Sequence, residues 1–524
     1  MAPVTVGSNR FIGFVQRHGR ALFIVCALLL IATVVLLSYA TRLSPSVRDK
    51  AVEELSSRFQ SDVEMDWLQV AVFPRPAVAG GGLRLRHNGR TDVPPLITIG
   101  SYSASAGFFG LFSSPPRLRT VELDRLEIRI PPGGVRGAAE PLGNESNARV
   151  MIDKLTAREA RLEIIPRDKG KLPRVFEIHN LVIGGLGHSD GSPFHAVVTN
   201  PTPRGEITTQ GNLGPWQKAE PRRTPVRGTY VFNDANLDTI KGIGGVLSST
   251  GAYSGVLEKI EVKGETDTPD FSIDIANQPV PLKTRFHAIV DGTNGDTFLE
   301  QVEARLMETV ILAKGAVVRA EDVKGRKTTL DVKIENGRIE DVLKLAVKSK
   351  TTPMTGRMRL DTSFLLPAGD RDVIEKLQLD GTFRLDRARF TSVNVQKQIN
   401  ELSRRGRGDL DNEPSSVVSN LSGRFALRNG TLRLSRLTFG VPGAVVQLAG
   451  TFDLQQEMLD FKGDVLLDAS LAEMTTGFKS LVARMAQPLF RRKGGGSKLP
   501  IRVEGPLAKP KFGLDVKRAL TPGD

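Results

Sequence analysis

The chain has 524 residues, 40% of them hydrophobic, so it is long enough for two or three domains or one extended array and can bury a core. Its 72 Lys and Arg against 58 Asp and Glu give a net charge of +14, which suits nucleic acid, anionic lipid headgroups or simply a soluble surface. The single cysteine, Cys26, excludes disulfides and thiolate metal sites from the rest of the chain. The 52 Gly and 31 Pro favour short strands and turns over long helices.

An uncharged run of 20 residues, Ala21–Ala40, stands near the N-terminus. That is the length needed to cross the hydrocarbon core of a bilayer. Arginines but no acidic residue precede it, which predicts a cytoplasmic tail (1–20), a transmembrane helix (21–40) and a body on the far side of the membrane. The alternative is a cleaved signal peptide with its cleavage site at Ser38–Ala40.

The next segment, 41–130, begins with a helix over 44–60, because Val47, Ala51, Leu55 and Phe59 recur every four residues. Alternating apolar residues then predict strands, and 121–130 reads as a strand interrupted by a tight turn or bulge. The Pro- and Gly-rich stretch 131–148 is predicted to be a linker or loop.

A short pattern, apolar-x-apolar-x-Gly-x-apolar-x-apolar, recurs at irregular spacing through the rest of the chain. The closest copies are Leu377–Leu385 and Val446–Leu454. Alternation of this kind puts the apolar residues on one face of a strand. A glycine in the middle of a strand costs stability, so its recurrence indicates a kink or a close approach that lets a wide sheet curl. Helices are predicted only at 339–347, 393–403 and 471–490; the last is amphipathic, and we expect it either to cap the sheet or to contact a membrane.

The order of several motifs resembles the AsmA-like family of bacterial envelope proteins, from the anchor nearly to the C-terminus. The motifs are Val70–Pro74, Phe390–Ile399, Gly450–Leu454, Leu499–Gly505 and Pro506–Phe512. The resemblance implies an inner-membrane anchor, a periplasmic body and a link to outer-membrane lipid homeostasis. Larger relatives form long β-grooves with apolar interiors that are regarded as bridges for lipid transfer.

The expected fold is therefore mainly β: one N-terminal transmembrane helix, then an extended, curled antiparallel β-sheet groove with a few short helices. The resemblance divides the body into an AsmA-like helix and strands (41–130), the linker (131–148), a central β region (149–335) and an AsmA-like C-terminal β region with helices (336–520).

Residues for catalysis or metal binding do not converge anywhere in the sequence. His179, His188 and His195 are spaced irregularly, and no nucleophile elbow, phosphate loop or nucleic-acid module is present. We expect no enzyme activity, no cofactor, no metal and no nucleic-acid partner.

Two functions remain open. The first is a lipid-handling protein whose partners are membrane phospholipids; the second is a scaffold or assembly factor that offers a sheet edge to envelope proteins. The predicted groove-lining residues are Leu377, Leu379, Phe383, Leu385, Val446, Leu448, Phe452 and Leu454. If they line an empty groove, each of these side chains should be partly exposed.

Overall fold

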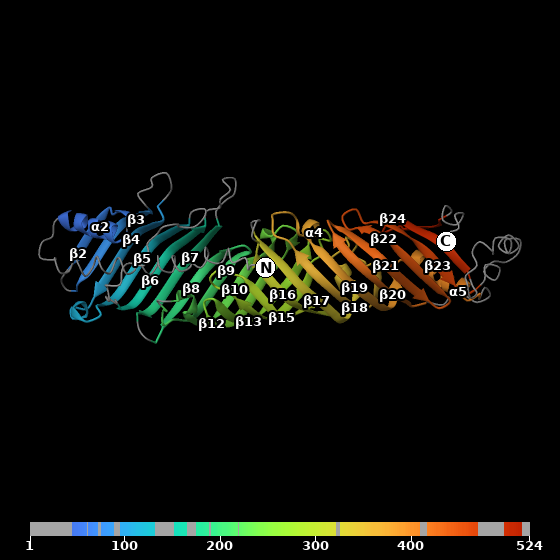
Figure 1. Ribbon diagram of the computed structural model, residues 1–524, viewed down its shortest axis with the longest axis horizontal. Coiled ribbons are helices and arrows are strands. Elements are labelled where there is room, and N and C mark those ends of the chain that lie inside the picture. The colour runs from blue at the N-terminus through green and yellow to red at the C-terminus, as the bar shows by residue number, and fades with distance from the viewer. Residues whose placement is uncertain are drawn as a thin grey trace, which may run out of the picture. The chain divides into compact units, whose positions relative to one another are not determined.

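The computed structural model is mainly β, with few and short helices (Figure 1). It describes residues 45–59, 61–71, 75–87, 95–130, 151–164, 174–187, 190–217, 220–320, 325–408, 417–469 and 497–515. The predicted anchor (21–40), the linker (131–148) and the amphipathic helix (471–490) lie outside these ranges. None of the helices within the described ranges has both the length and the hydropathy of a membrane span.

The chain divides into two compact units. Unit 1 comprises the described residues of Met1–Asn236, Ser248–Gly264 and Ile289–Asp296, and unit 2 those of Leu237–Leu247, Glu265–Ala288 and Thr297–Asp524. Ten strands lie wholly in unit 1: β1 (Ser61–Glu64), β2 (Trp67–Ala71), β3 (Ala77–His87), β4 (Ile97–Ala106), β5 (Arg117–Ile130), β6 (Met151–Ile164), β7 (Arg174–Leu186), β8 (Ser192–Pro201), β9 (Arg204–Leu213) and β10 (Pro225–Asn236). β12 (Val246–Val256), β13 (Lys259–Ile273) and β14 (Val280–Val290) contribute residues to both units.

One pair of strands corrects the expectation of a purely antiparallel sheet. β5 and β6 pair in parallel, with Leu118 opposite Ile152 and Ile128 opposite Leu162. A parallel pair needs a crossover of a dozen or more residues, whereas a hairpin needs only a few. The chain has twenty residues between Ile130 and Met151, so the stretch around the predicted linker is long enough for this crossover. The expected irregularity of 121–130 lies at Arg125, which has φ 52° within the continuous strand β5.

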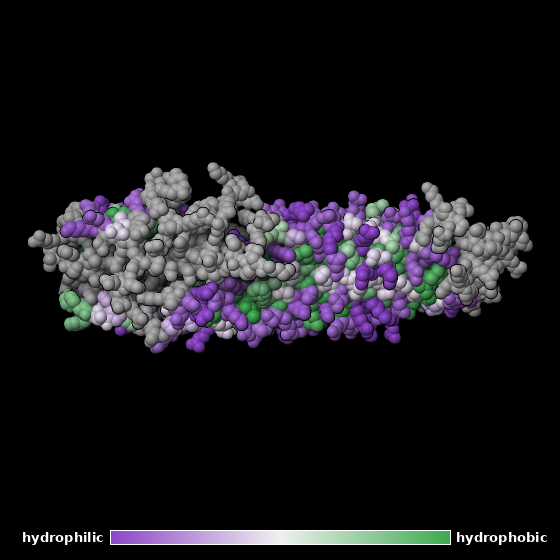
Figure 2. Space-filling model, in the orientation of Figure 1, coloured by the Kyte–Doolittle hydropathy of each residue, from purple (hydrophilic) through white to green (hydrophobic). Residues whose placement is uncertain are grey.

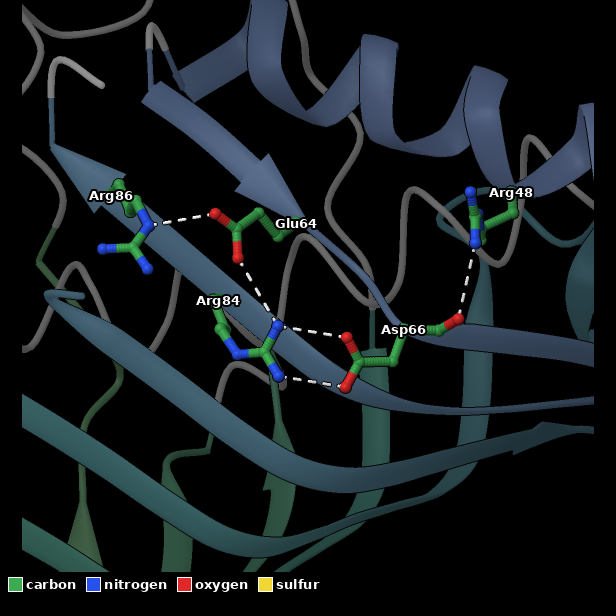
Figure 3. Close-up of polar contacts among 5 residues, drawn as sticks. All are labelled: Arg48, Glu64, Asp66, Arg84 and Arg86. Atoms are coloured by element: carbon green, nitrogen blue, oxygen red, sulfur yellow. Dashed lines mark hydrogen bonds and ion pairs between the residues drawn. The ribbon is translucent and has the colours of Figure 1, made fainter. Parts of the chain in front are cut away.

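The predicted first helix is confirmed as α2 (Pro45–Phe59). Salt bridges tie the segment that follows it to β3. Glu64 pairs with Arg86 at 3.0 Å, and Asp66 accepts two hydrogen bonds of 3.0 Å from Arg84 (Figure 3). The hydrogen bond from Arg86 is the largest cause that lowers the pKa of the Glu64 carboxyl.

The core of unit 1 is built from the alternating residues of β3 to β6. Ile99, Leu118, Leu123 and Leu155 are fully buried in it, and Leu55 of α2 joins them. Helix α2 therefore packs its apolar side on the strands, and the apolar residues of neighbouring strands are buried on one face of the sheet. This is the arrangement expected for strands with alternating apolar residues.

Unit 2 contains β11 (Ile243–Gly244), ten longer strands and a short final strand. These are β15 (Thr297–Leu306), β16 (Thr309–Arg319), β17 (Arg326–Arg338), β18 (Met354–Leu366), β19 (Gln378–Phe390), β20 (Ser419–Arg428), β21 (Thr431–Val441), β22 (Ala444–Asp453), β23 (Met458–Leu467), β24 (Ser497–Pro506) and β25 (Lys511–Leu514). From β16 onward each described strand pairs antiparallel with the one before it.

Two of the predicted helices of unit 2 are confirmed. α3 covers Ile339–Leu343, ending earlier than predicted, and α5 covers Val393–Gly406, ending slightly later. Ser392 begins α5 by accepting a hydrogen bond from the Val395 amide. A further single turn, α4 (Val373–Lys376), starts in the same way at Asp372, whose side chain accepts from the Ile374 amide.

Candidate functional site

The inner residues of β15 to β24 form continuous apolar rows, because residues directly opposite each other in a sheet project to the same side. We call the surface made by these rows the apolar face. One row runs Leu299, Gly315, Leu330, Phe364, Leu379, Leu427, Leu432, Phe452, Leu459 and Gly505. A second runs Ile334, Leu360, Phe383, Gly423, Leu437, Leu448, Gly463 and Ile501. The apolar face thus continues over ten strands without a charged residue in either row.

The glycines of these rows provide close approach. A Cβ atom on Gly423 would lie 2.8 Å from Cε1 of Phe383, and one on Gly463 would overlap the backbone carbonyl of Gln447. Real Cβ atoms do not approach other atoms so closely. The ring of Phe383 and the backbone of β22 therefore occupy the space that these two glycines leave, which gives the recurring glycine of the sequence pattern its use.

The structure brings six of the eight predicted groove residues into the rows of the apolar face. Leu379 and Phe383 of β19 and Leu448 and Phe452 of β22 lie in the two rows given above. Leu385 of β19 and Val446 of β22 lie in a third, parallel row, through Leu421 and Phe439. The other two lie just outside their strands. Leu377 follows α4 as its C-terminal cap, and Leu454 follows β22, where its amide donates to the Gly430 carbonyl at 3.0 Å.

The expected partial exposure holds for only half of these residues. Leu377, Leu379, Phe383 and Leu448 are partly exposed. Leu385, Val446, Phe452 and Leu454 are buried, with 2 to 9% of their surface exposed. At these four positions the apolar face is an ordinary protein core, because other parts of unit 2 cover it.

Helix α5 covers one end of the face. Ile399 and Leu402 pack against the buried cluster that contains Leu385 and Val446. The Ser403 hydroxyl donates to the Pro442 carbonyl at 2.8 Å and fixes the last turn of the helix over the β21–β22 hairpin.

Connecting segments cover the other end. Ile275, Ala346, Ile374 and Leu377 pack against the cluster that contains Phe425 and Phe452. The segment after α3 is held there by Lys348, whose amide donates to Glu457 Oε1 at 3.0 Å and whose Nζ donates to the Gln455 carbonyl at 3.2 Å.

The apolar face is least covered over β15 to β18. Leu299, Leu330, Val332 and Phe364 are partly exposed and belong to none of the buried clusters in the described residues. We call these four residues the open section. Leu299, Leu330 and Phe364 share a row with Leu379 and Phe452, so extending the alternation from Leu379 back to Phe364 and Leu330 would have identified them in the sequence.

The opposite face of the same strands is exposed and mostly polar, although Phe298, Leu312 and Val445 also lie on it. Ion pairs cross between neighbouring strands there, for example Lys333 with Asp361 at 3.6 Å and Lys498 with Asp464 at 3.5 Å. Such exposed pairs contribute little to stability, and they keep this face in water. On the side of unit 2 seen in Figure 2, apolar patches interrupt a mostly hydrophilic surface.

Two charged groups border the apolar face with shifted pKa values. Burial lowers the pKa of Lys376 in α4, where its Nζ donates to the Gly369 carbonyl at 2.6 Å. A hydrogen bond from Arg404, aided by Arg405, lowers the pKa of Glu401 in α5 to about 2. Both side chains make their contacts within the segments that cover the apolar face, and neither residue belongs to its rows.

Within the described part of the chain, no three His, Cys, Asp or Glu residues are placed to hold a metal ion. His179 contacts Thr199 at 2.7 Å on the exposed surface of β7, and His195 lies on β8. The apolar face is thus an uncharged surface that can bind other apolar groups.

No protein-family model, curated protein or solved structure matches this chain.

Proposed function

We propose that the protein is a non-enzymatic lipid-handling protein of the bacterial envelope, which holds phospholipid acyl chains against the apolar face of unit 2. The observation that carries the proposal is the continuity of the apolar rows over ten strands, with partly exposed side chains in the open section. Burying apolar surface yields roughly 25 cal/mol per Å² without any directional contact. Such a surface suits acyl chains, which offer no hydrogen-bonding groups.

The setting of this activity belongs to the same proposal. Ala21–Ala40 spans the inner membrane with the N-terminus in the cytoplasm, and the body lies in the periplasm. The sheet curls into an extended groove with the apolar face on its concave side, and lipid headgroups remain at the groove's mouth. The motifs that resemble the AsmA-like family support this setting, and so does the spacing of glycines along the rows.

The decisive experiment compares lipid bound to the full chain with lipid bound to two matched variants. Phe364→Glu puts a charge into the open section, and Ser363→Glu puts the same charge on the exposed opposite face of the same strand. After purification in detergent, native mass spectrometry and lipid extraction measure the bound phospholipid. We expect Phe364→Glu to lose bound lipid with little change in melting temperature, and Ser363→Glu to retain it. Equal lipid content in both variants, or none in the parent, would contradict the proposal.

A second function is favoured by the edge strand β25. Phe512 and Leu514 extend the apolar rows and are 49 and 57% exposed, and among the described strands β25 pairs only with β24. An exposed edge is a template for a partner's strand, as an assembly factor for outer-membrane proteins would need. In that case a Phe512→Asp, Leu514→Asp double variant loses binding of an extended β-barrel strand peptide and keeps its lipid. If lipid handling alone is correct, the parent does not bind the peptide.

A further inference from the structure

Three phenylalanines stand exposed on one loop of unit 1. Phe108, Phe109 and Phe112 lie in the connection between β4 and β5, around a single 3-10 turn (Gly110–Phe112), and are 60, 87 and 79% exposed. The ring centroid of Phe108 is 6.1 Å from that of Phe109 and 6.2 Å from that of Phe112. We call this group the Phe cluster. Large apolar side chains gathered in water indicate a contact surface.

The Phe cluster lies at the end of unit 1 toward which the N-terminal end of α2 points. α2 runs antiparallel to β1 and β2, because Ser56 accepts from the Val63 amide and Arg48 donates to the Asp66 carbonyl. The start of α2 therefore points toward the turn between β2 and β3. The Ala106 amide donates to the Pro76 carbonyl at 3.0 Å, which puts the cluster's loop beside that same turn. Both α2 and this loop lie at the left end of unit 1 in Figure 1.

The distance to the bilayer is short on this side. Pro45, the first residue of α2, follows Ala40 by five residues. Such a stretch spans at most about 18 Å when fully extended. A bilayer crossed by residues 21–40 thus lies within reach of this end of unit 1.

The charges beside the Phe cluster are basic. Arg75 lies in the β2–β3 turn and Arg119 lies on β5; both are exposed, and no ion pair to either is found among the described residues. Arg117, at the end of the loop, pairs with Asp153 at 2.6 Å. By contrast, Arg84 and Arg86 are engaged by Glu64 and Asp66 (Figure 3), so they are not available for headgroup phosphates.

We propose that the Phe cluster docks unit 1 on the membrane that holds the anchor, with its rings at the boundary of headgroups and acyl chains and with Arg75 and Arg119 facing anionic headgroups. Aromatic side chains favour that boundary, and basic residues near an anionic surface add attraction. The loop and the anchor are then two attachments of one unit to one bilayer, which fixes how the unit stands on it. This inference rests on the membrane attachment in the proposed function, but not on lipid binding by unit 2.

The test measures the depth of a tryptophan at the cluster in proteoliposomes of the full chain. Phe109→Trp is compared with Val231→Trp, a control on β10 of the same unit whose parent side chain is 39% exposed. The vesicles contain phosphatidylethanolamine and phosphatidylglycerol with a fraction of brominated phospholipid. After subtraction of the parent's fluorescence, we expect bromine to quench the Phe109→Trp signal about two-fold and to leave the Val231→Trp signal unchanged. Adding Arg75→Glu and Arg119→Glu should weaken the quenching.

Equal quenching in the two variants would overturn the proposal, and so would failure of the protein to float with the vesicles. Cross-linking of the cluster to a second protein without quenching would assign it to a protein partner instead. Quenching of Phe109→Trp in a protein that carries no lipid would leave the docking intact and reject lipid handling. Bound lipid without quenching would do the reverse.

Discussion

The core of unit 1 and the open section of unit 2 are built from the same alternation of residues, yet they differ in what covers them. Leu123 on β5 is 1% exposed, packed among β3 to β6 with α2 alongside. Leu330 on β17 also points to the apolar side of its strand, but it is partly exposed and belongs to no buried cluster among the described residues. Alternation therefore identifies which residues share a face, and the covering segments decide whether that face is a core or a surface.

The largest effect should come from a charge placed in each region. Leu123→Asp buries a carboxylate without a partner, which costs several kcal/mol and should unfold unit 1. Leu330→Asp leaves the carboxylate within reach of water, so the protein should stay folded with a modest loss. Thermal melting followed by circular dichroism measures both. Similar melting temperatures for the two variants would remove the distinction between the regions.

A sharper comparison uses two neighbours on β22. Val446 is buried beneath α5, whereas Leu448 is partly exposed in the next row. We expect Val446→Glu to cost at least about 3 kcal/mol and Leu448→Glu about half as much, since only the first charge is sealed from water. Urea unfolding measures the two costs. Lipid extraction from Leu448→Glu then tests whether lipid reaches this row, and a collapse of its stability to that of Val446→Glu would show that it is closed.

Truncation of aromatic residues should show the same contrast on a smaller scale. Phe461→Ala, in the buried part of the apolar face, should cost about 3–5 kcal/mol, the usual range for a closed core. Phe364→Ala, in the open section, should cost less than about 2 kcal/mol, because water already reaches its ring. Equal costs in urea unfolding would mean that the open section is packed as tightly as the rest.

The smallest effect concerns the helix that closes one end of the face. The pKa of Glu401 is about 2 in the folded protein, against an ordinary value of 4.5, because Arg404 and Arg405 donate to its carboxylate. A lowered pKa stabilises the fold above pH 4.5, and this contribution is lost as the pH falls from 4.5 to 2. The pair is partly exposed, so we expect only about 1 kcal/mol. Glu401→Gln should lower the melting temperature by about 2 °C at pH 7 and by less at pH 3.

Much of the local structure could be predicted from the sequence. A four-residue apolar spacing located α2, and the alternation in 377–385 and 446–454 placed six of the eight candidate residues on one face of two strands. Both signals are local, because the spacing of apolar residues within one helix or strand shows its periodicity without reference to any other element.

The remaining features depend on contacts between distant segments. The parallel pairing of β5 with β6 is invisible in either strand, because both read as ordinary alternating strands. The burial of Val446 depends on α5, and that of Phe452 on the segments around Ala346 and Ile374. The residue pattern of β22 itself gives no information about which segments cover it. Leu330 and Phe364 were not predicted, because their strands β17 and β18 carry no close copy of the glycine-centred repeat.

The antiparallel succession of strands from β15 to β25 also has a consequence for folding kinetics. Each strand of this series pairs with the one made just before it, so most of its contacts join residues close in sequence. Low contact order of this kind favours fast, stepwise folding in the direction in which the chain emerges. The crossover between β5 and β6 breaks this order in unit 1, because β6 can join only after twenty further residues have appeared. That step should be the slowest addition among the pairings of unit 1, and the moment when the edge of β5 is most open to mispairing.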